Sequence, residues 1–384
     1  YPPEDAFGHL ENSYDIDLLK LGNLYSFYAD ADGIDINLAR TYFFNACSDS
    51  AIVAAGVHAL NQYRQCNRGA PFLAGNTGYD HLLQEMLSGL THKNTAQTVS
   101  SGYMVHSIVL PSLLEKDAVI VMDEQNSPAL WEAAAASGCE IQSYRHNDVS
   151  DLDRILGEHW SRKKLVVTES VFSLFGDIAS ISEIAQLKRQ HDFRLYIDES
   201  NCIGLFGSYG GGLSVHENIA ESVDVIAASL QPGFGIDCGF FAGSNTIVEY
   251  IKHTSSSLVF GSGVPPSSVA MLISAIEKIY RSGCNHDEFF QKVNFLAESI
   301  TSAGYQVIQN SLPLINIVIG DPILALAMQK KLLQESILVS IVGAPTLPPE
   351  KTSLRLAINN DIDFDQLDQV AHQFKKLKPA IGSS

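Results

Sequence analysis

The residues best suited to chemistry stand at the end of one strand-like run and at the start of one helical run. In YIDES (196–200), Asp198 closes a buried apolar run, and open α/β sheets bind ligands at the carboxyl ends of their strands. Such an aspartate can pair with a protonated ring nitrogen and hold a cofactor in its electron-accepting form. It can equally be a capping or salt-bridging residue, and this run alone leaves both interpretations open.

A second candidate is TVSSGYMVHSIVL (98–110), where Ser101, Gly102 and Tyr103 fall at a predicted helix start. Free backbone N–H groups at a helix start suit a phosphate, although a plain N-cap would place the same residues there. Arg355, in SLRLAIN near the C-terminus, can bind a carboxylate through two parallel hydrogen bonds. The alternative for Arg355 is an ordinary charge on an edge strand.

Other reaction classes find little support in the sequence. The glycine-rich run GSYGGG (207–212) lacks the following Lys-Ser or Lys-Thr of a nucleotide-binding P-loop. No histidine pair frames a glutamate at metal-ligand spacing, and no GxSxG run offers a hydrolase nucleophile. We therefore expect neither a metal centre nor a serine-hydrolase triad.

Composition narrows the possible partners. The chain has 384 residues, of which 25 are basic and 43 acidic, and its formal charge is −18. Nucleic acids and anionic membranes bind basic surfaces, so neither is expected as a main partner. No apolar stretch is long enough to span a bilayer and no signal-like segment opens the chain, which together predict a soluble, cytoplasmic protein without a membrane span. The cysteines are scattered without a CxxC pair, so we expect reduced and mostly buried thiols at Cys47, Cys66, Cys139, Cys202, Cys238 and Cys284.

Strand-like and helical runs alternate from about residue 50 onward. Short β-branched runs at 117–123, 163–170, 193–200 and 224–230 are typical of buried parallel strands. Helical stretches separate these runs, and the first helix, in DSAIVAAGVHALNQY (49–63), has Asp49 or Ser50 as its N-cap. The alternation predicts an α/β fold whose mainly parallel sheet is covered by helices on both faces.

The pattern changes after FGSGVPP (260–266), where a long helical region leads into mixed short strands and helices. We predict three parts. Residues 1–48 form an N-terminal arm with a short helix and a small hairpin, residues 49–280 form the large domain, and residues 281–384 form a smaller C-terminal α+β domain.

Taken in order, several runs resemble the α-oxoamine synthase family of fold-type-I, pyridoxal-phosphate-dependent transferases. The resemblance covers residues from about 45 to 375, and the motifs are specific in combination rather than singly. The runs that carry it are AGNTGYDHLLQEML, SSGYMVH, YRHNDVSDLDRIL, VVTESVFSLFGDIASISEIAQLKRQHDFRLYIDES, GLFGSYGGGLSVHE and FGSGVPP. The resemblance implies acyl transfer from an acyl-CoA to an amino acid, with pyridoxal phosphate (PLP) as cofactor and a site at a dimer interface.

The resemblance also implies contacts for the cofactor ring and phosphate. Asp198 matches the aspartate that holds the pyridine nitrogen, and Gly102 and Tyr103 match the phosphate-binding amides. Ser229 matches a hydroxyl three positions before the family's lysine, and Ser173 matches a serine near the ring hydroxyl.

Two further matches involve the partner subunit and the substrate. Ser262 matches the residue that, in the family dimer, reaches the partner's cofactor phosphate. Arg355 matches the arginine that binds a substrate carboxylate.

The departures from the family pattern fall on the residues that perform its chemistry. The lysine that forms an imine with the cofactor aligns with Pro232 in SLQPGFG. The histidine that stacks on the ring aligns with Ser127 in DEQNSPALWEA, and the histidine after the DE pair aligns with Asn201 in DESNC. A lysine between Gln231 and Pro232 would give SLQKPGFG, a plausible family motif, so a modified lysine omitted from this stretch is the other explanation for the gap.

Three hypotheses follow from this pattern. The same losses, together with DEQNSPALWEA and LPPEKTSLRLAIN, resemble the lysine-lacking subunit of serine palmitoyltransferase, which implies a pseudoenzyme that supports a catalytic homologue in sphingolipid biosynthesis. The second hypothesis is an active, homodimeric α-oxoamine synthase. The third is a non-catalytic binding or scaffold protein that keeps only the fold, because fold does not determine function.

Overall fold

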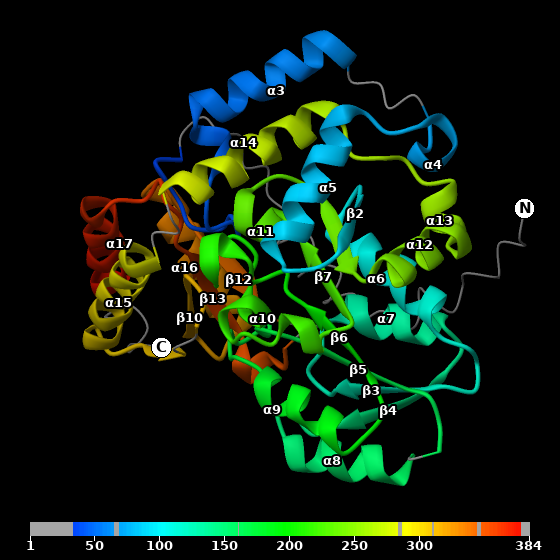
Figure 1. Cartoon of the computed structure of the whole chain (residues 1–384). Coiled ribbons are helices and arrows are strands. Elements are labelled where there is room, and N and C mark those ends of the chain that lie inside the picture. Colours follow the sequence, from blue (N-terminus) through cyan, green and yellow to red (C-terminus); the bar gives the residue numbers. More distant parts are fainter. Residues whose placement is uncertain are drawn as a thin grey trace, which may run out of the picture.

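The larger part of the molecule is built on a seven-stranded sheet flanked by helices (Figure 1). The computed structural model describes residues 34–64, 69–159, 161–282, 286–308, 311–343 and 347–377. The strand order is β2-β8-β7-β6-β5-β3-β4, in which β3 to β7 run parallel and β8 is antiparallel to both of its neighbours. The mainly parallel sheet confirms the predicted fold class. The helix and hairpin predicted within residues 1–45 lie for the most part outside the described residues.

Four strands of this sheet, β3, β5, β6 and β7, match the predicted buried runs, and β2, β4 and β8 were not among those runs. The strands are β2 (Thr95–Val99), β3 (Val119–Asp123), β4 (Glu140–Tyr144), β5 (Lys164–Glu169), β6 (Arg194–Asp198), β7 (Val225–Ser229) and β8 (Gly239–Gly243). The helices of this part are α3 (Ser50–Tyr63), α4 (Pro71–Ala74), α5 (Gly78–Leu90), α6 (Gly102–Leu113), α7 (Pro128–Ala136), α8 (Val149–Glu158), α9 (Ile181–Gln186), α10 (Leu213–His216), α11 (Gln231–Phe234), α12 (Asn245–Thr254), α13 (Ser256–Val259) and α14 (Pro266–Ser282).

Both faces of the sheet are buried, which explains why its strands read as continuous apolar runs. Successive side chains of a strand point to opposite faces. In β3, Ile120 and Met122 pack in one cluster with residues of α6, α7 and α12, whereas Val119 and Val121 pack in another with residues of α8 and α9. The side chains of β3 are therefore buried on both faces of the sheet.

The helix predicted over residues 49–63 is α3, which begins directly after its N-cap residue. The Asp49 carboxylate accepts hydrogen bonds from the N–H groups of Ala51 and Ile52, which confirms Asp49 as the N-cap of α3. α3 packs along α14, and a side-chain carbon on Gly56 would lie 2.7 Å from the Met271 side chain. Glycine at this position allows the two helices to approach closely.

A smaller unit follows α14, seen at the left of Figure 1. Its four-stranded antiparallel sheet has the order β12-β13-β10-β9, and β1 pairs in parallel with β11 beside it. The strands are β1 (Ile36–Asn37), β9 (Gln306–Ile308), β10 (Leu314–Val318), β11 (Ile337–Leu338), β12 (Ser340–Val342) and β13 (Ser353–Ala357), and the helices are α15 (His286–Ser302), α16 (Pro322–Gln334) and α17 (Phe364–Leu377). The division of the chain at residues 48 and 280 remains a proposal.

The described cysteines carry free thiols, as predicted, and two of them, Cys202 and Cys238, are buried, whereas Cys47 is exposed and Cys139 is partly buried. Cys66 and Cys284 lie outside the described residues. Within the described ranges, no helix is both long enough and apolar enough to cross a bilayer.

Candidate active site

The carboxyl ends of β6 and β7 hold a buried polar cluster around Asp198. The Oδ1 atom of Asp198 accepts hydrogen bonds from the Ser200 backbone N–H at 2.8 Å and from the Ser200 hydroxyl at 2.5 Å. The Ser200 hydroxyl oxygen in turn accepts a hydrogen bond from the Ser229 N–H at 2.8 Å. Two of the predicted cofactor contacts, Asp198 and Ser229, are therefore linked through a single serine.

His106, on α6, forms the second contact of Asp198. Its Nε2 atom lies 3.1 Å from Asp198 Oδ2, and its Nδ1 atom lies 2.6 Å from the Tyr196 hydroxyl. Burial opposes the charge of Asp198, but His106 and Ser200 outweigh it and lower the pKa of this carboxyl. Asp198 is thus held as an anion inside the protein. Our sequence analysis missed His106, although its spacing of four residues from Gly102 places both on one side of a helix.

The hydrogen bonds of Asp198 leave room for one more donor. A carboxylate has about four lone-pair positions, two on each oxygen. Ser200 uses both positions of Oδ1, and His106 uses one position of Oδ2. A protonated ring nitrogen could occupy the remaining position, so the cluster fits the role predicted for Asp198.

The start of α6 forms a cradle against Ser229. The N-cap residue Ser101 makes no side-chain capping bond to the helix. A side-chain carbon on Gly102 would lie 2.3 Å from Ser229 Cβ and 2.6 Å from Ser229 Oγ, so only glycine fits this position. The Tyr103 side chain points elsewhere, since its hydroxyl donates to Glu132 and its ring is exposed. Backbone N–H groups of the helix start beside a serine hydroxyl suit a phosphate.

A buried carboxyl that the sequence analysis did not single out organises the other side of the cluster. Glu169, at the end of β5, accepts hydrogen bonds from the Ser127 N–H at 2.5 Å and the Ser173 N–H at 3.4 Å. Burial and the nearby Asp198 charge raise the pKa of Glu169 to about 8. Asn201 donates to the Val171 carbonyl at 3.0 Å. The signal for Glu169 was the same as for Asp198, an acid closing a buried strand.

The turn between β7 and α11 contains no amine. α11 begins at Gln231, whose N–H donates to Ser229 Oγ at 3.3 Å, and the Pro232 carbonyl accepts from the Phe43 N–H at 2.8 Å. The sequence has no lysine between Lys188 and Lys252. Lys188 bonds Asp224 near the amino-terminal ends of the strands, and Lys252 bonds Glu249 on α12. Neither lysine lies in this turn.

Arg355 lies on β13, an interior strand, so the interpretation of this residue as an edge-strand charge is wrong. Its Nε atom is buried without a hydrogen-bond partner, and burial lowers the pKa of its guanidinium. Arg355 stands opposite Asn316 in register, and the Asn316 side chain donates to the Leu174 carbonyl at 3.2 Å. The strand of Arg355 is thereby tied to the loop that carries Ser173. A partly buried guanidinium whose Nε has no partner fits a carboxylate ligand.

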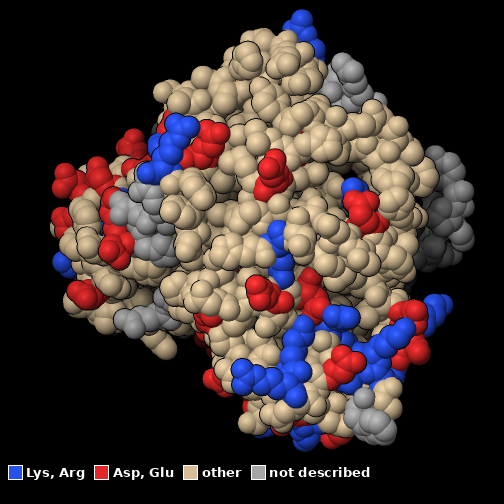
Figure 2. Space-filling model, viewed as in Figure 1, with Lys and Arg blue, Asp and Glu red and all other residues tan. Residues whose placement is uncertain are grey.

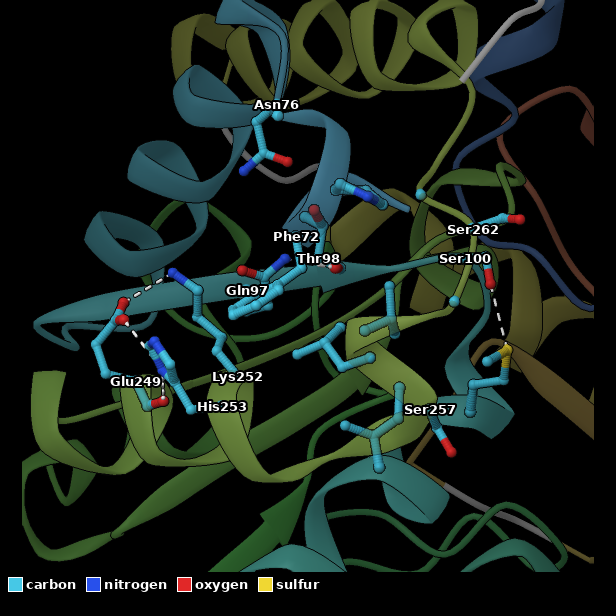
Figure 3. A pocket seen from close by; sticks show the side chains of 18 of the residues that line it. Phe72, Asn76, Gln97, Thr98, Ser100, Glu249, Lys252, His253, Ser257 and Ser262 are labelled. Atoms are coloured by element: carbon cyan, nitrogen blue, oxygen red, sulfur yellow. Dashed lines mark hydrogen bonds and ion pairs between the residues drawn. The ribbon is translucent and has the colours of Figure 1, made fainter. Parts of the chain in front are cut away.

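Ser262 lies in a separate cavity of about 380 Å³ on the other side of α6 (Figure 3). Ser100 and Met104 line this cavity with Ser262, and Figure 3 shows Glu249 bonded to Lys252 and His253 at its far side. No described contact joins Ser262 to the Asp198 cluster. The role of Ser262 in a partner's site therefore stays a prediction.

The glycine-rich run 207–212 wraps a carboxylate rather than a phosphate. Glu199 is fully buried and accepts hydrogen bonds from the Leu213 N–H at 2.9 Å and the Ser214 N–H at 2.7 Å. A side-chain carbon on Gly212, which has φ +95°, would lie 2.9 Å from the Glu199 carboxylate. The glycines are thus required by this internal packing. Among the described residues, no group of His, Cys, Asp and Glu is arranged to hold a metal ion.

His146, from the HND run, bridges two carboxylates at the carboxyl-end edge of the large sheet. Its Nδ1 atom lies 2.9 Å from Asp123 and its Nε2 atom lies 2.7 Å from Asp177. Burial opposes protonation, but the two carboxylates outweigh it and raise the pKa of His146. This contact joins β3 to the loop that follows β5.

We expect the stability contributed by His146 to fall as the pH rises. Below the unfolded pKa of 6.5 the imidazolium is present in both states and the bridge contributes fully, and the contribution is lost as the pH rises through the higher folded pKa. Urea unfolding at about pH 5.5 and about pH 9 should show a larger deficit for His146→Gln at the lower pH. His372→Gln, at an exposed position of α17, is the control. An equal deficit at both pH values would contradict the prediction.

Comparison with known proteins identifies the family. Residues 45–374 match the family model described as aminotransferase class I and II, so this chain belongs to that family. Solved serine palmitoyltransferases share the fold. The Sphingomonas wittichii enzyme aligns with a TM-score of 0.89 and 23% identity over 98% of both chains, and another structure, determined with PLP, aligns with a TM-score of 0.89 and 22% identity over 99% of both.

The curated relatives are α-oxoamine synthases, which confirms the resemblance drawn from the motifs. A putative 8-amino-7-oxononanoate synthase 2 from Mycobacterium tuberculosis H37Rv is 27% identical over 98% of this chain, and the chain spans half (50%) of that relative's length. The 8-amino-7-oxononanoate synthase of Thermoanaerobacter pseudethanolicus is 25% identical over 89% of this chain and 87% of its own. The serine palmitoyltransferase of Bacteroides ovatus is 25% identical over 87% and 85%.

Proposed function

We propose that this chain is an α-oxoamine-synthase-type subunit without the imine-forming lysine. Its role is to support a homologous catalytic subunit in the decarboxylative condensation of an amino acid with an acyl-CoA. The observation that carries the proposal is the turn between β7 and α11, which holds Gln231 and Pro232 and no amine. Imine exchange with a lysine is the entry step of PLP chemistry on amino acids, and proline has no titratable group to replace it.

The residues that would make the non-covalent contacts to PLP are nevertheless present. Asp198 would hold the ring nitrogen, and the start of α6 with Ser229 would hold the phosphate. When bound, PLP supplies an electron-accepting ring for carbanion chemistry. Arg355 would orient a substrate carboxylate with its unpaired Nε.

The residues around the ring offer no replacement acid or base at the two aligned histidine positions. Ser127 caps α7 with its N–H bonded to Glu169, and Asn201 is bonded to a backbone carbonyl. Loss of a positioned acid–base group typically lowers a rate by about 10²–10⁴-fold. We therefore expect the chain by itself to be inactive.

The contribution of this chain to a partner is structural. If Ser262 reaches a partner's cofactor phosphate, as in the family dimer, a lysine-free chain can still complete the partner's site and preorganise it. The names of the relatives as synthases favour the alternative, an active homodimer.

The test is expression of the chain alone and together with a lysine-bearing homologue, followed by assay of condensation. We expect no turnover alone and more turnover in the mixture than from the homologue alone. Ser262→Ala in this chain should lower the rate of the mixture by about 10-fold, the value of one hydrogen bond to a charged group. Ser257→Ala, in the same cavity, is the matched control. Turnover by the chain alone would establish the homodimeric enzyme. A mixture no more active than the homologue alone would instead support the scaffold hypothesis.

A further inference from the structure

A second cavity lies at the amino-terminal edge of the large sheet, opposite the Asp198 cluster. Its volume is about 690 Å³, and it is lined by the loop 92–94, the first residues of β6 and β7, and parts of α6 and α12. Five residues of strand separate this edge from Asp198, a distance of about 13–17 Å. The cavity is therefore not part of the proposed cofactor site.

Lys93 lines this cavity with an amine whose contacts match its uncharged form. Its Nζ donates hydrogen bonds to the carbonyls of Ala220 and Val223. A protonated amine has three donors, whereas a neutral amine has two N–H donors and one lone pair. Two backbone acceptors thus match the two N–H donors of the neutral form.

Two carboxylates at the cavity, Asp224 and Glu221, favour the protonated form of Lys93, but basic groups share Asp224. Asp224 is engaged by Lys188 and by Arg194 at 2.9 Å, and its Oδ2 also accepts the Leu195 N–H at 2.8 Å. Burial first, and then the charge of Lys188, lower the pKa of Lys93 to about 8, while Asp224 and Glu221 act in the opposite direction. The remaining titratable side chains at the cavity are His92, Arg194 and Tyr250.

Apolar side chains form much of the remaining cavity wall, together with the polar residues Asn94, Ser244 and Thr246. Leu113 and Leu114 at the end of α6, Ile247 on α12 and Val223 line it, and Tyr250 stands at an exposed position beside them. Figure 2 shows that basic side chains on one face of the molecule gather over the part occupied by α8, α9 and neighbouring strands in Figure 1. The cavity offers a short alkyl chain a place beside the amine.

We propose that Lys93 is an acylation site for acyl thioesters, with the alkyl chain of the acyl group held in this cavity. The neutral Nζ attacks the thioester carbonyl carbon, a C–N bond forms and the C–S bond breaks. The thiolate leaves and takes up the proton released by nitrogen, and the product is an amide without any change of oxidation state. The inference does not depend on the proposed function, because the site, the reagent and the test are independent of PLP.

The test is incubation of the full chain with octanoyl-N-acetylcysteamine or acetyl-N-acetylcysteamine, with mass spectrometry of each acylated lysine. At about pH 8 roughly half of Lys93 is neutral, against well under 1% of an ordinary lysine, so we expect Lys93 to react at least about 10-fold faster than Lys163. Lys163 is an exposed internal control whose pKa is raised by Glu115. The preference for Lys93 should be greater with the octanoyl reagent and should vanish in denaturing urea.

Two variants test whether Lys93 is the acylated residue and whether its reactivity follows its protonation state. Lys93→Arg removes the amine and should remove only the Lys93 label. Glu221→Gln, at an exposed position, removes a charge that favours the protonated amine, so the midpoint of the pH–rate profile of Lys93 should move to lower pH. The proposal is overturned if Lys93 reacts no faster than Lys163, or if the acetyl reagent shows the same preference as the octanoyl reagent.

Discussion

Replacing Pro232 with lysine is expected to give this chain a borohydride-reducible bond to PLP at residue 232. The natural chain should show no such bond between residues 189 and 251, because that segment contains no lysine. The change costs little in the fold, since proline has no N–H to lose and the Pro232 carbonyl keeps its bond to Phe43. The new amine would stand beside a site that already has Ser229 and Asp198.

The measurement is reduction of the PLP-treated protein with borohydride, followed by peptide mapping for pyridoxyl-lysine. We expect labelling of residue 232 to change from absent to near stoichiometric in Pro232→Lys. Gln231→Lys is the matched control, because neighbouring positions on a helix point about 100° apart. Label on Lys93 is expected as background in all variants, and mapping separates it from the engineered site.

Labelling of residue 232 also depends on the non-covalent contacts to PLP, so variants of the residues that make these contacts provide a second test. Asp198→Ala added to Pro232→Lys should reduce labelling at residue 232 at limiting PLP, because the ring nitrogen loses its anionic partner. His106→Asn should have a smaller effect in the same direction, since it acts through Asp198. Equal labelling in Pro232→Lys and Gln231→Lys would contradict the view that the turn faces a cofactor site.

The sequence was sufficient for α3 and for four strands of the large sheet because their physical signals are local. Doubly buried strands read as apolar runs, the Asp49 cap stands directly before its helix, and Asp198 was found because it closes such a run. The family resemblance added Ser229 and Gly102, and the structure shows why they belong together, since the serine fills the space above the glycine.

The partners of buried polar groups could not be predicted in this way. His106 meets Asp198 and Tyr196 only when α6 packs on the sheet, and no spacing along the chain encodes that contact. The interior position of Arg355 depends on the pairing of β13 with β10 and β12, which is a long-range property of the small sheet. The contacts of Lys93 could not be predicted for the same reason, because its carbonyl partners lie far away in sequence.

Arg355→Met is expected to stabilise the protein while weakening its binding of carboxylates. Arg355 is partly buried, and its Nε has no partner, so the folded state carries a desolvation cost without full compensation. Methionine has a similar length without this cost, and replacement of buried ion pairs by apolar residues of similar volume is neutral or raises stability by up to about 1–4 kcal/mol, so we expect a gain at the lower end of this range.

Urea denaturation of Arg355→Met and of Arg281→Met separates this effect from a general preference for methionine. Arg281 is exposed on α14, and its replacement should change the unfolding free energy by less than about 0.5 kcal/mol. Titration with a small amino-acid carboxylate should show binding to the natural chain that Arg355→Met loses by about 10-fold or more. A loss of stability in Arg355→Met would mean that the guanidinium is already satisfied within the protein. An uncompensated arginine retained in a core at the expense of stability is the behaviour expected of a residue kept for a ligand, and the two measurements together distinguish that from a purely structural role.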